Sequence, residues 1–195
     1  YEPKDFFDTG LIFTNSVTLS TGTEKNQTFF SAATVNSEGI VPNNYYDRYN
    51  FTFRNTSYFL NDKLRLDVGA SYIVQKDQNM TSQGVYSNPL VSAYLFPRGE
   101  DFSLAENFER YNPARGIYEQ YWPYGEGGDL RMQNPYWIAY RNLRNNERNR
   151  YMLSASLSYD ILPWLNVAGR VRVDNANNLY TQKLYASSNP TLLEG

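Results

Sequence analysis

The sequence contains neither cysteine nor histidine among its 195 residues. Without cysteine the chain forms no disulfide and has no thiol nucleophile. Without histidine it cannot build a Ser-His-Asp triad, a zinc or iron site with histidine ligands, or a haem held by histidine. These absences exclude the commonest metal and nucleophile chemistries, and we expect neither a metal nor a cofactor.

Long apolar runs and an excess of positive charge are also missing. No segment of the sequence approaches the roughly 18 consecutive apolar residues that a transmembrane helix requires. The 18 lysines and arginines nearly balance the 20 aspartates and glutamates, for a net charge of −2. A chain without bulk positive charge has no general electrostatic attraction to nucleic acid, so we expect no nucleic-acid partner.

Aromatic residues, by contrast, are abundant. They make up 16% of the chain, with 18 tyrosines, while the mean hydropathy is only −0.62. The core of a water-soluble domain would need more Leu, Ile and Val than this composition offers. We therefore expect the tyrosines either to serve a recognition surface or to lie at an interface that is half apolar and half wet.

Alternation of apolar and polar residues marks the segments 63–75, 151–161 and 165–174. A period of two predicts β-strands, and residues 15–21, 28–35 and 48–58 are less regular but rich in residues that strands favour. The one helical signal is Ser103-Leu-Ala-Glu106, which matches a capping box before a short helix that ends near Tyr111. The pattern predicts an all-β, antiparallel fold of about six long strands.

The lengths of the strands and their connections favour a membrane barrel. The three regular segments are about 10 to 13 residues long, whereas strands in soluble sheets have about five or six and a tilted strand needs about 9–11 to cross a bilayer. Short connections near residues 22–25, 61–62 and 162–163 alternate with longer ones over residues 36–47, 76–149 and after 175. Outer-membrane barrels alternate in this way, because their periplasmic turns are tight and their extracellular loops are long. We predict a segment of a transmembrane β-barrel with one very long extracellular loop that contains a short helix.

In such a barrel the polar face of each strand lines a hydrated interior and the apolar face contacts lipid. We therefore expect four charged residues to face the lumen: Arg65, Asp67, Arg170 and Arg172. Aromatic residues near both ends of the strands would mark the two membrane interfaces. A soluble sheet with one buried face would show the same alternation, so the pattern by itself leaves that alternative open.

Several short motifs occur in order in the first part of the chain. They are Asp5-Phe-Phe-Asp-Thr-Gly10, Asn15-Ser-Val-Thr-Leu-Ser-Thr-Gly22-Thr-Glu-Lys25, Phe29-Phe-Ser, Asn36-Ser-Glu-Gly39-Ile and Arg48-Tyr. This block resembles a signature of the SusC/RagA family of TonB-linked outer-membrane transporters, in which it follows the plug domain. The match is densest over residues 5–75, and residues 76–147 carry no motif of the family.

The resemblance implies an energised importer in the outer membrane. In the family a barrel of about twenty-two strands encloses a plug, TonB pulls on the plug, and a SusD-like lipoprotein caps the extracellular mouth. The substrates are usually glycans or oligopeptides. This chain lacks a TonB box, an N-terminal extension domain and a plug, and about six strands are too few to close a barrel. We therefore expect it to be a segment of a longer protein surrounded by outer-membrane lipid.

Under this interpretation the chain divides into five parts. Residues 1–14 form an extracellular connection, 15–75 four barrel strands, 76–147 the long extracellular loop, 148–175 two further strands, and 176–195 the start of the next loop. The long loop holds six aromatic candidates for contact with substrate: Tyr118, Tyr121, Trp122, Tyr124, Tyr136 and Trp137. Aromatic planes stack on sugar rings, but the same residues could form the loop's own core or pack against neighbouring loops and the lipoprotein.

Two other functions remain open at this point. A secreted, β-rich module could bind glycans through the aromatic loop, and it would bury its apolar strand faces between two sheets. A glycoside hydrolase could use a pair of carboxylates from Glu100, Asp101, Glu106 and Glu109. These acids lie in a polar stretch without an evident pocket, so we expect no catalytic residue and no enzymatic activity.

Overall fold

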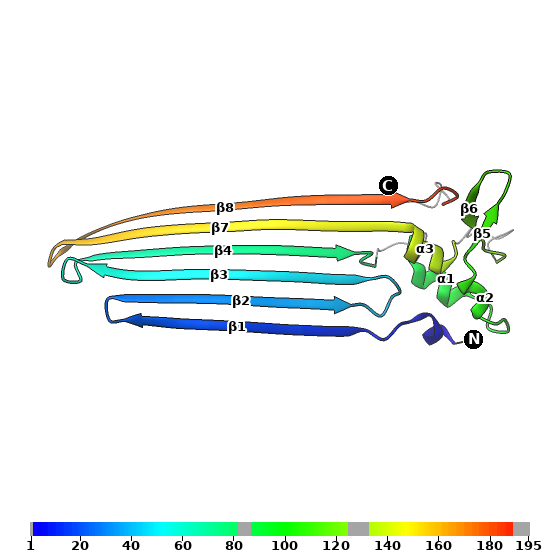
Figure 1. The fold of residues 1–195 in the computed structure, drawn as a ribbon, viewed down its shortest axis with the longest axis horizontal. Helices are drawn as coiled ribbons and strands as arrows, with labels where there is room; N and C mark the ends of the chain where they lie inside the picture. Colours follow the sequence, from blue (N-terminus) through cyan, green and yellow to red (C-terminus); the bar gives the residue numbers. More distant parts are fainter. Residues whose placement is uncertain (1, 82–86, 125–132, 189–195) are drawn as a thin grey trace.

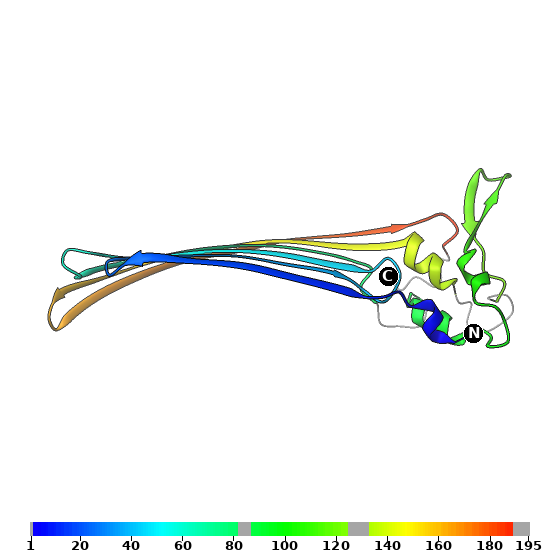
Figure 2. The same cartoon turned by 60° about the horizontal axis from the view of Figure 1, so that its bottom comes forward.

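One long antiparallel sheet dominates the computed structural model, which describes residues 2–81, 87–124 and 133–188. Its six strands have the order β1-β2-β3-β4-β7-β8, and β5 and β6 form a separate hairpin. The sheet is open, with β1 and β8 at opposite edges (Figure 1). Figure 2 shows it as a single twisted layer, with the helices and the small hairpin gathered at one end. The predicted antiparallel arrangement of six strands is confirmed, and the sheet is not closed into a barrel.

The six strands of the sheet agree with the predicted segments and are longer. They are β1 Leu11–Thr23, β2 Asn26–Glu38, β3 Tyr45–Phe59, β4 Leu64–Gln78, β7 Asn142–Leu162 and β8 Leu165–Leu184. Residues 11–14, 76–78, 142–147 and 176–184, which the predicted division placed in connections, therefore belong to strands. Over residues 142–147 and 176–184 both faces are mostly polar, so no alternation marks them, and backbone pairing between β7 and β8 holds them in the sheet.

Tight turns join β1 to β2, β3 to β4 and β7 to β8, and all three lie at the same end of the sheet (Figure 1). Strand pairing continues up to Thr23 and Asn26 in the first hairpin and up to Leu162 and Leu165 in the last. The longer connections and the N-terminal segment lie at the opposite end. The predicted separation of short and long connections is confirmed.

The end with the long connections carries more helix than the sequence suggested. Its elements are η1 Pro3–Phe6, α1 Pro89–Leu95, α2 Ser103–Glu106, β5 Glu109–Asn112, β6 Ile117–Gln120 and α3 Pro135–Arg141. We call them together the loop-end module. The predicted helix is present as α2, but the capping box was wrong: Phe102 is the N-cap, and the Asp101 carboxylate accepts from the Ser103 amide at 3.0 Å. Tyr111 lies in β5, beyond the end of α2.

The hydrophobic core lies in and around the loop-end module, with Val41 of the β2–β3 connection packed into it, and not under the sheet. Its central cluster consists of Phe6, Val41, Ala93, Phe96, Phe102 and Ala105. Rings meet edge to face there, as between Phe96 and Phe102, whose centroids are 5.0 Å apart. Among the described residues, no buried hydrophobic side chain belongs to a strand of the six-stranded sheet. The sheet therefore leaves its apolar side chains outside any protein core.

Candidate functional site

The register of the strands sorts the side chains of the sheet into two faces. Residues two apart in a strand point to the same side, and directly paired residues share a side. One complete row across the sheet is apolar: Leu19, Phe30, Phe53, Ala70, Leu153 and Val173. We call the side that carries this row the apolar face and the opposite side the polar face. On β7 and β8 the odd-numbered residues belong to the apolar face.

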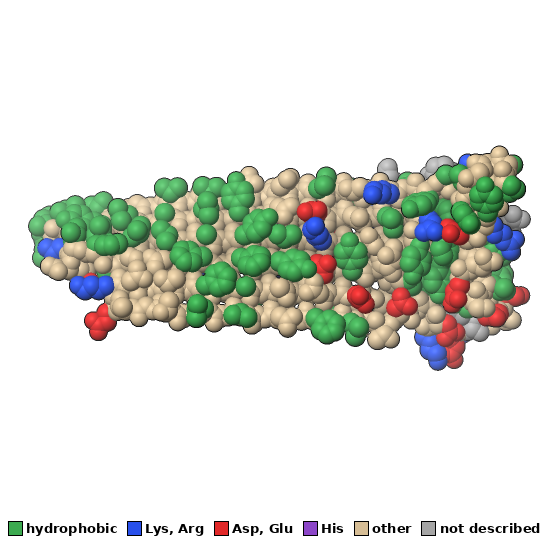
Figure 3. All heavy atoms as spheres, in the orientation of Figure 1, with side chains coloured by type: hydrophobic (Ala, Val, Ile, Leu, Met, Phe, Trp, Pro, Cys, Tyr) green, Lys and Arg blue, Asp and Glu red, His purple; other side chains and the backbone are tan. Residues whose placement is uncertain are grey.

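The apolar face is exposed over its whole width. Val171 on β8 is 67% exposed and Leu153 on β7 is 48% exposed, and large hydrophobic side chains on the other strands are exposed to a similar degree. Figure 3 shows one side of the sheet, with hydrophobic side chains (green) spread over its middle and its turn end. A contiguous apolar surface of this kind marks an interaction site. Within the described ranges no second layer covers it, in contrast to the two sheets expected for a secreted binding module.

The apolar residues form a slanted band. On β1 they extend from Leu11 to Leu19, centred near Asn15, which the register places level with Asn177. On β8 the continuous apolar stretch extends from Leu165 to Val173, and its centre lies about eight residues nearer the turn end. Eight residues at about 3.3 Å each, over five strand spacings of about 4.8 Å, give a slant of about 48°, close to 45°. Strands of outer-membrane barrels tilt by about 35–45°, so a lipid band would cross them at this angle.

The polar face carries the four charged residues predicted to face a lumen. Arg65, Asp67, Arg170 and Arg172 lie together with Arg54 around one hollow of about 350 Å³, which we call the arginine hollow. Asp67 is paired with Arg65, at 3.0 Å between Nε and Oδ2, and also accepts from the Thr56 hydroxyl at 2.7 Å. The sequence pattern missed Arg54, because β3 alternates less regularly than its neighbours.

Most of the six loop aromatics pack inside the loop-end module. Trp137 is 0% exposed, and its Nε1 donates to the Ser188 hydroxyl at 3.0 Å. Trp122 and Tyr124 pack against Phe96, with centroids 6.0 and 4.9 Å away. Burial raises the pKa of the Tyr124 hydroxyl. These contacts fit the alternative in which the aromatics form the loop's own core.

The remaining aromatics differ in how accessible they are. The Tyr136 ring lies 5.3 Å from the Phe6 ring, and the Arg110 guanidinium covers Tyr121 at 3.2 Å from the ring centroid. Tyr118 on β6 is 58% exposed and lies 5.4 Å from Tyr111 on β5, which is 56% exposed. The sequence analysis missed Tyr111, which only the pairing of the short hairpin brings beside Tyr118.

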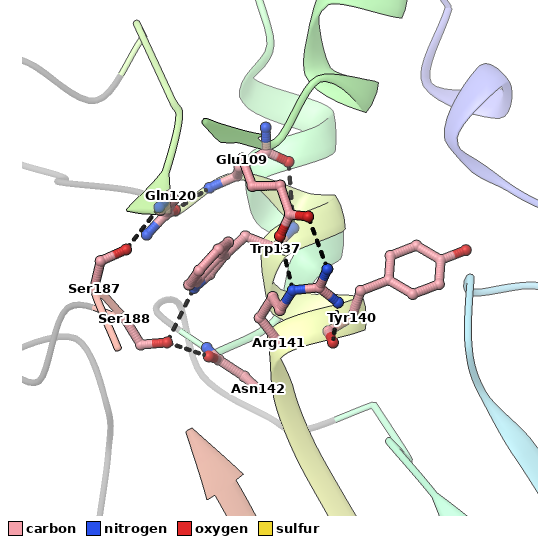
Figure 4. A network of polar contacts seen from close by, with 9 residues as sticks. Glu109, Gln120, Trp137, Tyr140, Arg141, Asn142, Ser187 and Ser188 are labelled. Carbon is pink, nitrogen blue, oxygen red and sulfur yellow. Dashed lines mark hydrogen bonds and ion pairs between the residues drawn. The ribbon is translucent and has the colours of Figure 1, made fainter. Parts of the chain in front are cut away.

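A polar network ties the loop-end module to the ends of β7 and β8 (Figure 4). The Ser188 hydroxyl donates to the side-chain oxygen of Asn142 at 2.7 Å, and the backbone N–H of Gln120 donates to the Ser187 hydroxyl at 2.6 Å. Arg141 at the end of α3 holds both carboxylate oxygens of Glu109, at 2.8 and 2.9 Å. With both oxygens occupied, Glu109 is poorly placed to act as the acid or base of a hydrolase.

No group of three or more metal-ligating side chains comes together in the described ranges. None of the helices in the described part of the chain is long and apolar enough to span a membrane. Comparison with models of known protein families finds no match, and a search of curated proteins finds no similar chain.

Proposed function

We propose that this chain forms part of the wall and one large extracellular loop of a TonB-dependent outer-membrane importer of the SusC/RagA type. Such a protein would take up glycans or oligopeptides together with a SusD-like lipoprotein, and it would be a transporter and not an enzyme. The observation that carries the membrane part of the proposal is the exposed, slanted apolar band on a single-layer sheet. The motif block over residues 5–75 supports the choice of family.

The height of the band fits the hydrocarbon layer of an outer membrane. On β7 the apolar face is continuous from Tyr151 to Ile161, a length of about 33 Å along the strand at about 3.3 Å per residue. At a tilt near 45° this length spans about 23 Å of membrane thickness, close to the apolar band of about 25 Å found in outer-membrane barrels. The three tight turns would then face the periplasm, and the loop-end module would lie outside the cell.

The free edges of the sheet agree with a role as one part of a larger barrel. Among the described residues, strands β1 and β8 each pair on one side only, so the other side presents backbone N–H and C=O groups without strand partners. In lipid each unpaired group costs several kcal/mol, which is why barrels close on themselves. We propose that further strands of the same barrel pair with both edges.

Within this proposal the small hairpin is the best-placed loop element for substrate. Tyr118 and Tyr111 present two exposed rings side by side, on which a sugar ring or an aromatic peptide side chain could stack. Trp137, Trp122 and Tyr124 would instead keep the module in shape. We therefore assign the substrate-contacting role to Tyr118 and its neighbour Tyr111.

A scan with single cysteines tests the orientation of the sheet, and these 195 residues contain no native cysteine that would compete for the label. In the protein as it is made in the outer membrane, each position from 151 to 161 would be labelled in turn with a fluorophore that reports lipid. We expect blue-shifted emission at the odd positions and water-like emission at the even ones. Emission without alternation, or recovery of the protein in the aqueous fraction, would refute the proposal.

A further inference from the structure

We propose that the arginine hollow on the polar face binds a small oxyanion, namely a carboxylate or phosphate group of an acidic solute. The inference deepens the proposed function by naming acidic solutes as the substrate class. It rests on that function only for the route by which a solute reaches this face. The site itself is formed by side chains that are present and accessible in the structure.

Charge is the first argument for an anion. Four guanidinium groups border the hollow, and Asp67 is the one carboxylate among the lining residues. Asp67 is already engaged by Arg65 and by the Thr56 hydroxyl. Within the described ranges Arg54, Arg170 and Arg172 form no ion pair, since the carboxylates of the sheet pair with other cations or lie elsewhere. Three unpaired guanidinium groups around one hollow leave a concentrated positive charge.

The backbone register explains why these side chains converge. Arg54 on β3 and Arg172 on β8 lie in the same cross-strand row, separated by Gly69 and Ser154. Because these two residues are small, the surface between the two arginines is recessed and forms the floor of the hollow. A Cβ built on Gly69 would lie 2.8 Å from the Ser154 hydroxyl, so glycine lets this hydroxyl occupy the floor.

The adjacent row adds Arg170 to the set of donors. Arg170 is paired with Ser156, whose hydroxyl donates to the Asp67 carboxylate at 3.5 Å. Guanidinium groups form forked, charge-assisted hydrogen bonds that match the geometry of carboxylate and phosphate. The Ser154 hydroxyl on the floor can add a further donor. An oxyanion held from two sides by arginines and from below by serine fits this arrangement, whereas a neutral sugar would leave the charges unmatched.

Equilibrium dialysis of the purified full protein in detergent tests the site, with labelled inorganic phosphate and labelled citrate as separate probes. We expect saturable binding of at least one probe with a dissociation constant below about 10 mM, a binding free energy of at least about 2.7 kcal/mol. The double variant Arg170→Gln/Arg172→Gln should raise that constant by about tenfold or more. Arg170→Lys/Arg172→Lys keeps the charge but loses the fork, and its effect should be intermediate.

A charge-matched control separates a site from a general field. Arg48 and Arg148 also lie on the polar face, both paired with Gln75 in a row far from the hollow. Arg48→Gln/Arg148→Gln removes the same charge and should change the dissociation constant by less than about twofold. Equal weakening in the two glutamine variants, or no saturable binding by the unchanged protein, would overturn the inference.

The two proposals fail in different ways. Anion binding by a protein whose cysteine scan shows no alternation would support the arginine hollow and remove the membrane function. A clear alternation together with absent anion binding would do the opposite. Binding of phosphate but not citrate would identify phosphate as the group recognised, and the reverse would identify carboxylate.

Discussion

Replacing Val171 with arginine is expected to destabilise the protein in a bilayer by about 2–4 kcal/mol, the cost of a lipid-facing arginine near the middle of an outer-membrane barrel. The substitution introduces a charge between two native arginines, Arg170 and Arg172, whose side chains point to the polar face. The variant therefore tests whether the two faces of β8 are exposed to different solvents.

The magnitude follows from where Val171 lies. Its register partner on β7 is Ala155, near the middle of the apolar stretch from Tyr151 to Ile161, so the new charge would sit close to the centre of the membrane. A cost of about 2–4 kcal/mol lowers the folding equilibrium constant by a factor of about 30 to 1,000. Val171 is 67% exposed, so in water the same substitution should change stability by about 0.5 kcal/mol or less.

The measurement is reversible urea unfolding of the protein refolded into phosphatidylcholine vesicles. Ala168→Arg is the matched control, because it adds the same charge to the same strand on the polar face. Its expected cost is below about 1 kcal/mol, from repulsion by the neighbouring Arg170. Equal costs for Val171→Arg and Ala168→Arg in vesicles would refute the assignment of the apolar face to lipid.

Two predictions concern the loop-end module and do not depend on the membrane. Asn134→Asp should destabilise the module by about 3 kcal/mol, because the fully buried side chain caps α3 and donates to two backbone carbonyl oxygens that a carboxylate would repel. Hydrogen exchange of the α3 amides measures this cost, and the control Asn88→Asp, at the half-buried cap of α1, should cost less. Equal costs for the two variants would contradict the argument. The hydrogen bond from the Ser103 amide lowers the pKa of the Asp101 carboxyl. The stability that this hydrogen bond contributes is therefore fully present above the ordinary aspartate pKa of about 3.9, and it is lost as the pH falls through the lower pKa of the folded state. NMR titration of the Asp101 carboxyl checks the direction, and a pKa at or above that of an unfolded aspartate would contradict it.

The sheet could be predicted from sequence because its two faces differ in polarity over part of most strands. Residues 151–161 alternate between apolar and small polar side chains, which fixes both the strand and its sidedness. The first part of β7 escaped prediction, because Asn145, Asn146 and Glu147 place polar groups on both faces. Only the long pairing with β8 makes this part a strand, and pairing between distant segments leaves no local pattern.

The helices of the loop-end module were missed for a different reason. At seven residues each, α1 and α3 are too short to show a helical period of apolar residues. Both begin with asparagine followed by proline, and in each the asparagine side chain accepts from the backbone of the first turn. Asn88-Pro89 and Asn134-Pro135 therefore match the sequence pattern that marks the start of a helix. The sequence could not predict that Trp137 is buried while Tyr118 is exposed, since both depend on contacts between segments far apart in sequence.

The low mean hydropathy of −0.62 and the exposed apolar face have a common explanation. The buried hydrophobic residues of the described chain lie in and around the loop-end module, where Phe6, Phe96 and Trp137 are enclosed. The apolar residues of the sheet suffice for one face over part of each strand, and in the part of the chain that the structure describes no second layer covers them. In water that face would be a large aggregation-prone surface. In the membrane setting proposed above, lipid would cover this face without further protein, so a polar chain with many tyrosines could support a sheet one layer thick.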